Sequence, residues 1–164
     1  MRITKKKILI SFSAIVILYL LLLGLVYIIA PDPVVNDFPT GCRGDTPNCT
    51  RVADYNVRGE GLTPLLFNAS MQDVHDAISS WIKSQPRSSI LLDHPDFIHA
   101  KFLTFTMRFP DDFYTKLSCN NSQVLLWVQS QARLGQGDIN VNEDRVQEFF
   151  TAMQAANIPA GSCS

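Results

Sequence analysis

The longest apolar segment of the chain comes first. Uncharged residues run without a break from Ile8 to Ala30, and a helix of that length crosses a hydrocarbon core of about 30 Å. Residues 1–7 are rich in Lys and Arg, which favour the cytoplasmic side of a membrane helix. The pattern predicts a basic cytoplasmic N-terminus over residues 1–7, a transmembrane helix over residues 8–30, and a C-terminal domain that is periplasmic, extracellular or lumenal.

A cleaved signal peptide is the alternative interpretation of the same residues. The apolar region of a signal peptide is shorter, at about 7–15 residues, and ends at a small-residue cleavage site. Here Pro31 directly follows Ala30, which makes a poor cleavage site. We therefore expect an uncleaved, single-pass signal-anchor.

The chain beyond the anchor divides into an irregular part and a periodic part. Residues 31–61 are rich in Pro, Gly, Asp and Asn and have little apolar periodicity, which predicts a tether and an irregular segment. Residues 62–164 are enough for one globular domain.

Two segments of the globular part have helical periodicity. In the first, Val74, Ile78 and Ile82 share one face, Ser70 is a good N-cap, and Pro86 ends the helix. The second segment ends near residue 157, and its apolar face is formed by Val146, Phe149, Phe150 and Met153.

The region between the two helices has the pattern of antiparallel strands. Apolar and polar residues alternate in part, and Asn120-Asn121 suits a hairpin turn that needs positive φ. Four strands are expected, over residues 88–94, 96–109, 111–118 and 122–133. The predicted fold class is α+β: a transmembrane helix followed by a two-layer domain, with an antiparallel sheet of about four strands carrying two helices.

Charge and cysteine content narrow the class of protein. The formal net charge is −1, so no strong field points to nucleic acid or to an anionic lipid surface. The cysteines all follow the anchor, and an even number on the translocated side favours disulfides over a metal site. The short spacing favours a Cys42–Cys49 disulfide, which would leave Cys119 to pair with Cys163. The sequence alone does not fix the pairing among these four candidates.

The stretch from Arg133 to Arg145 places Asp or Asn at every second position, as in a calcium loop. Counting from Asp138, position 6 is Glu143 where an EF-hand needs Gly, and position 12 is Phe149 where it needs Glu. The calcium interpretation therefore fails, and we predict no metal site and no cofactor.

A connection from a strand to a helix explains the same stretch better. Gly135 allows a turn with unusual φ, and Asn142 is the expected N-cap of the last helix. Asp138 is expected to pair with Arg133 or Arg145. A ligand site is the alternative, because a Gly-rich turn before a helix also holds anions.

The pair Asp111-Asp112 is a second candidate for chemistry. Adjacent residues on a strand point to opposite faces, so these two carboxylates cannot readily share one proton or one metal ion. A turn after Pro110 is the simpler interpretation.

Three stretches resemble one known family, domain of unknown function 1499. They are "DTPNC" (Asp45–Cys49), "FIHAKFLTFTMRFPDDFYTKL" (Phe97–Leu117) and "SQARLGQGDINVNEDRV" (Ser130–Val146). The positions that fill the family pattern are Asn48, Cys49, His99, Asp111, Asp112, Ser130, Arg133, Gly135, Asp138, Asn142 and Arg145.

The chain departs from that pattern at three positions. Gln129 and Ala132 stand where the family usually has Arg and Ser, and Asn140 stands where Gly is usual. Asn is the next-best residue after Gly for positive φ, so the turn is expected to survive. The resemblance implies that one polar cluster meets in space, either as a buried network or as a binding cleft, formed by Asp111, Asp112, Arg133, Asp138, Asn142 and Arg145.

The resemblance supplies no activity, because none is established for the family. From the anchor, the expected disulfides and the absence of a catalytic motif, we predict a non-enzymatic binding or assembly module at the outer or lumenal membrane face. Its expected partners are the membrane itself and a membrane protein, with no nucleic acid. The alternative is a hydrolase or small-ligand enzyme that uses the Asp/Arg/Asn cluster.

Overall fold

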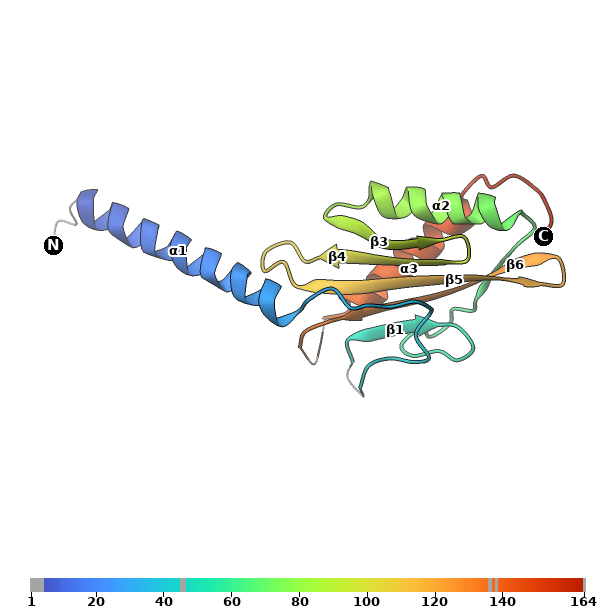
Figure 1. Ribbon diagram of the computed structural model, residues 1–164, viewed down its shortest axis with the longest axis horizontal. Coiled ribbons are helices and arrows are strands. Elements are labelled where there is room, and N and C mark those ends of the chain that lie inside the picture. Colours follow the sequence, from blue (N-terminus) through green and yellow to red (C-terminus); the bar gives the residue numbers. More distant parts are fainter. Residues whose placement is uncertain (1–4, 45–46, 136, 138, 164) are drawn as a thin grey trace.

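An apolar helix and an α+β domain make up the molecule. The computed structural model describes residues 5–44, 47–135, 137 and 139–163. The helix α1 (Lys5–Ile29) projects from the domain as an arm (Figure 1). Among the described residues it is the one helix long and apolar enough to cross a membrane. The expected membrane-anchor helix is therefore present, as a candidate by its length and composition.

The domain is built on one antiparallel sheet. Its spatial order is β1-β6-β5-β4-β3, and β2 pairs with β6 beyond the end of β1. Strands β5 and β6 form the long central hairpin, with Thr115 opposite Val128. The strands are β1 (Cys49–Val52), β2 (Leu65–Phe67), β3 (Ser88–His94), β4 (Phe97–Leu103), β5 (Pro110–Asn120) and β6 (Gln123–Ala132).

The prediction of about four strands is wrong, because the sheet has six. The four expected strands are β3 to β6, and the two additional ones are β1 and β2, of four and three residues. Strand β1 lies inside residues 31–61, the segment predicted to be irregular. Such short strands show no periodicity, and both are held by backbone pairing to β6, which a local pattern does not reveal.

Helices α2 (Met71–Ser84) and α3 (Val141–Ala155) pack against one face of the sheet. The core between them is apolar and closely packed. The ring centre of Phe149 lies 4.9 Å from that of Trp81 and 5.1 Å from that of Phe113. Alternate positions of the strands therefore supply the core, and the intervening positions face the other way.

The opposite face of the sheet is also covered. Residues 31–44, here called the strap, leave α1, run across this face toward the far end of the sheet and return. Lys101 and Lys116 of the sheet bind Asp32 and Asp37 of the strap, each at 2.8 Å or less. A simple two-layer arrangement is therefore not confirmed, since chain lies over both faces.

Local rules explain most element boundaries. Ser70 caps α2 by accepting a hydrogen bond from the Asp73 amide at 3.1 Å. The β5–β6 turn has positive φ at Asn121 and Ser122, one position later than the Asn pair suggested. Such a two-residue turn matches the twist of the strands that it joins.

The start of α3 differs from the prediction. Asn140, at φ +65°, precedes the first helical residue, and its side chain caps no amide. Asn142, the predicted N-cap, lies inside the helix and is fully buried. The positive φ at Asn140 confirms that Asn retains the turn where the family usually has Gly.

Two disulfides fasten the ends of the domain, which confirms the expectation of disulfide bonds. Cys42 pairs with Cys49, joining the strap to β1, and Cys119 pairs with Cys163, joining the central hairpin to the C-terminal tail. The described residues include no free cysteine. Both bonds fit an oxidising compartment.

The two disulfides should stabilise the domain unequally. They close loops of 7 and 44 residues, and chain-entropy arguments give about 2 and about 4 kcal/mol for such loops. We expect the double substitution C119S/C163S to lower the free energy of unfolding more than C42S/C49S does. Denaturant unfolding of the full chain in detergent would measure both, and the reverse order would contradict the loop-length argument.

Candidate functional site

The two faces of β5 organise the polar residues of the domain. Asp111 points toward the helices and Asp112 toward the strap, and each carboxylate is buried. Each has its own arginine: Asp111 accepts from Arg145 at 2.8 Å, and Asp112 accepts from Arg133 at 2.7 Å. The sheet thus separates two polar networks.

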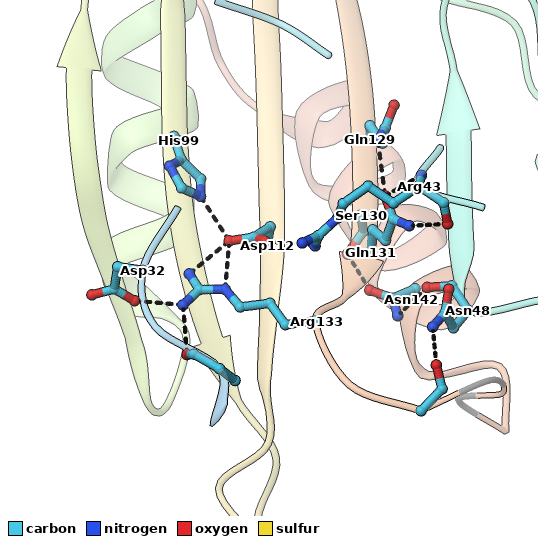
Figure 2. A network of polar contacts seen from close by, with 12 residues as sticks. Asp32, Arg43, Asn48, His99, Asp112, Gln129, Ser130, Gln131, Arg133 and Asn142 are labelled. Atoms are coloured by element: carbon cyan, nitrogen blue, oxygen red, sulfur yellow. Dashed lines mark hydrogen bonds and ion pairs between the residues drawn. The ribbon is translucent and has the colours of Figure 1, made fainter. Parts of the chain in front are cut away.

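Asp112 is the centre of the network under the strap (Figure 2). Its Oδ1 accepts from the Nε2 atom of His99 at 2.8 Å and from the Nε and Nη2 atoms of Arg133 at 3.0 and 2.7 Å. Its Oδ2 accepts from Arg43 of the strap at 2.9 Å. The side chain of Asp112 is 0% exposed, so these donors replace the water that a buried charge has lost.

Competing effects set the ionisation of Asp112. Burial raises the pKa of its carboxyl, but the hydrogen bonds of His99 and Arg133 and the charge of Arg133 outweigh burial and lower that pKa below its ordinary value. Burial lowers the pKa of Arg133, but Asp112 and Asp32 outweigh it and raise that pKa. Asp112 and Arg133 therefore form a charged pair at neutral pH.

Strand β6 extends the same network along the strap through its alternate residues. Gln131 exchanges two hydrogen bonds with the backbone of Arg43, at 3.0 and 2.9 Å. Gln129 donates to the carbonyl of Gly41 at 3.2 Å and accepts from Arg51 at 2.7 Å. The strap lacks strand partners here, and these side chains bind its backbone groups instead.

The network on the helix side joins β6 to α3. Arg145 donates to the hydroxyl of Ser130, to the amide oxygen of Asn142 and to Asp111, each at 2.8 Å. Ser130 also donates to Asn142 at 2.6 Å, and Asn142 donates to the carbonyl of Asn48 at 3.0 Å. These contacts fix the first turn of α3 to the sheet.

The predicted polar cluster is therefore divided by the sheet. Asp111, Asn142 and Arg145 meet on the helix side, whereas Asp112 and Arg133 meet under the strap. Asp138 lies outside the described residues, so its expected pairing stays a prediction. The five described members of the predicted cluster do not line one cleft, because β5 and β6 lie between the two groups.

Several members of the network under the strap are not among the predicted site residues. His99 fills a position of the family pattern, and Asp32 and Arg43 lie in the segment expected to be irregular. A sequence signal was available for part of it: Gln129, Gln131 and Arg133 fall on alternate positions of one strand, which marks a polar face.

A cavity of about 650 Å³ opens beside this network, where α1 meets the sheet. Helix α1 lines one side with apolar residues, including Leu23 and Val26. The sheet side carries Lys101 and Arg133, and Asp32 of the strap lies between them, accepting from Lys101 at 2.8 Å and from Arg133 at 2.6 Å. The cavity is thus apolar on one side and charged on the other.

The charged side chains of both networks are held by contacts within the protein. Both buried carboxylates are held by arginines, and the described cysteines are all in disulfides. Among the described residues no group of His, Cys, Asp and Glu is arranged to hold a metal ion. Asp112 can orient the imidazole ring of His99, as a catalytic carboxylate would. The pair lies under the strap, however, and this position fits a role in holding the strap in place.

Comparison with known proteins agrees with the family pattern. Residues 42–153 match the family model described as "Protein of unknown function (DUF1499)". This match covers the sheet, α2, all but the last two residues of α3, and both polar networks apart from the strap residues that precede Cys42. No curated protein matches the chain.

Replacing Asp112 should destabilise the domain strongly. D112N removes the buried charge that compensates Arg133 and leaves it only the half-exposed Asp32 as an ion-pair partner, and breaking a buried ion pair costs about 3–5 kcal/mol. The control is D37N, because Asp37 is 68% exposed and its bond to Lys116 belongs to a class that contributes at most about 1 kcal/mol. Chemical unfolding of both variants measures the difference, and equal effects would show that Asp112 is not central.

The lowered pKa of Asp112 predicts loss of stability in acid. The unfolded chain protonates Asp near pH 3.9, so the contribution is fully present above that pH and is lost as pH falls toward the lower folded-state value. Unfolding measured from about pH 6 to about pH 3 should have a shallower pH slope in D112N than in the natural chain. Identical slopes would contradict the assignment.

Proposed function

We propose, from the premise that the chain belongs to the DUF1499 family, that it is a membrane-anchored binding module without catalytic activity. In this proposal α1 spans the membrane with its N-terminus in the cytoplasm, and the domain lies at the outer or lumenal face. The ligand is an amphiphile with an anionic head group, held in the cavity between α1 and the sheet.

The single observation that carries this proposal is the two-sided lining of that cavity. Its volume of about 650 Å³ is within the usual range of small-ligand sites, roughly 300–1,000 Å³. Leu23, Val26 and Tyr27 present apolar surface from the part of α1 nearest the domain. An acyl chain that lies along α1 would therefore continue into the cavity from the bilayer.

The charged side of the cavity favours an anionic head group. Among the described residues of the lining, Lys101, Arg108 and Arg133 are cationic and Asp32 is acidic. The local surplus is positive although the whole chain has a net charge of −1. Arginine binds phosphate and carboxylate groups well because its planar donors match their oxygens.

A membrane-protein partner remains a second part of the proposal and rests on the anchor alone. The hydrolase alternative gains no specific support, because the sheet separates the residues on which it depended. We therefore assign the role to binding at the junction of helix and domain.

Filling the cavity should remove the ligand. We expect L23W to reduce the anionic lipid retained by the full chain after extraction in mild detergent, as measured by native mass spectrometry. The matched control is L21W, because Leu21 is 67% exposed on α1 and faces away from the cavity. Equal retention by both variants, or no retained lipid on the natural chain, would overturn the proposal.

A charge variant tests the head-group side of the same cavity. R108Q removes a charge-assisted hydrogen bond to the head group, of about 1.5–3 kcal/mol. We expect the affinity for anionic lipid to fall by roughly tenfold or more, as measured by the same native mass spectrometry. K83Q is the control, since Lys83 is exposed on α2 and does not line the cavity. Loss of neutral and anionic lipids alike in R108Q would contradict an anionic head group.

A further inference from the structure

Two loops of the domain lie at the end from which α1 projects. The β4–β5 loop (residues 104–109) and the turn from β6 to α3 are both at this end, while the β5–β6 hairpin and the C-terminus are at the other (Figure 1). These loops and the first residue of α3 carry exposed apolar side chains, called here the apolar rim. Its members are Phe105 at 78% exposure, Phe109 at 36%, Ile139 at 96% and Val141 at 38%.

The residues of the rim are neighbours in space. Phe109, Ile139 and Val141 line one cavity of about 240 Å³ between the two loops. Phe105 is at the tip of the β4–β5 loop, and the guanidinium of Arg87 lies 5.3 Å from the centre of its ring. Exposed apolar residues that gather in this way mark an interaction surface more often than scattered ones do.

Helix α1 identifies what the rim contacts. Val26 of α1 and Ala30, directly after the helix, lie against the domain at 4% and 8% exposure, and the hydroxyl of Tyr19 donates to the carbonyl of Thr106 at 2.7 Å. If the hydrocarbon core begins at Ile8, about twenty residues bring α1 to its outer boundary near residue 27. Tyr19, eight positions earlier, is then about 12 Å inside that boundary.

A loop bonded to Tyr19 cannot lie in water when α1 spans the membrane. We propose that the apolar rim is inserted into the outer leaflet of the bilayer beside α1, so that the domain is held by the helix and by its own loops. This inference rests on the proposed spanning of the membrane by α1, and it concerns the exposed apolar side chains of the loops rather than the cavity, which the β4–β5 loop also lines through Arg108.

Four backbone groups of the β4–β5 loop have partners within the protein. The Thr104 amide donates to the Phe109 carbonyl at 3.0 Å, and the Phe109 amide donates to the Thr104 hydroxyl at 2.9 Å. The Thr106 carbonyl accepts from Tyr19. Backbone outside a helix is tolerated at membrane depth only where protein or a water-filled cavity surrounds it, and the bond to Tyr19 holds this part of the loop against α1.

A cation beside the rim fits the same position. Arg87 is exposed and lies against the ring of Phe105, and long basic side chains can keep their stems in apolar surroundings while the charged ends reach lipid phosphates. Phosphate is common to zwitterionic and anionic lipids, so insertion does not require an anionic bilayer. The rim thus contacts hydrocarbon and Arg87 contacts head groups.

Depth-dependent quenching tests the insertion directly. The full chain with F105W is reconstituted in phosphatidylcholine vesicles with and without lipids brominated on the acyl chain, and the quenching of tryptophan fluorescence is measured. The natural chain has two tryptophans of its own, and the quenching measured for that chain is subtracted. The control is L66W, because Leu66 is 48% exposed on β2, which pairs with β6 near the far hairpin. We expect roughly twofold or greater additional quenching in F105W, since inserted side chains lie about 5–10 Å within the boundary, and none in L66W.

Each result of this experiment decides the inference. Equal quenching of F105W and L66W overturns it, and so does shielding of F105W from aqueous iodide without quenching by brominated lipid, which would mean that a protein covers the rim. I139W provides an independent variant at a residue that is 96% exposed and has no packing to disrupt. Release of the chain by alkaline carbonate would instead overturn the membrane-spanning anchor itself, which separates failure of the proposed function from failure of this inference.

Discussion

A single buried carboxylate, that of Asp112, connects the parts of this protein that lie on the strap side of the sheet. His99 reaches it from β4, Arg133 from the end of β6 and Arg43 from the strap. Arg133 continues the connection to Asp32 and to the carbonyl of Ala30 at the end of α1. A charge without water needs several donors, and meeting that need brings together segments far apart in sequence.

The strap is the clearest result of this constraint. Its residues 31–44 have no helix or strand, yet they occupy a fixed course because buried glutamines and arginines of the sheet bind their backbone groups. Cys42–Cys49 then closes the return of the strap onto β1. An irregular segment is in this way made part of the folded domain.

Short-range patterns predicted what depends on short-range forces. Alternation located β3 to β6, and Ser70 began α2 as expected. Asp111 and Asp112 point to opposite faces as strand geometry requires, whereas the preferred interpretation of this pair, a turn after Pro110, is wrong because both residues lie in β5. The strap contacts join residues up to about a hundred positions apart, such as Asp32 and Arg133, and no local pattern contains them. The cap of α3 was misplaced because two asparagines, at 140 and 142, have the same intrinsic preference and only burial distinguishes them.

The bond of Arg133 to the end of α1 has a consequence for geometry outside the domain. In the proposed membrane-spanning arrangement, a flexible linker would let the domain rotate and tilt freely above the bilayer, whereas the contacts at the end of α1 make the connection rigid. The β5–β6 hairpin and the C-terminal tail would then be held at a constant distance from the membrane and in a constant orientation. The domain loses its orientational entropy once, during folding. A molecule that binds at the distal end would therefore not have to restrict the orientation of the domain again.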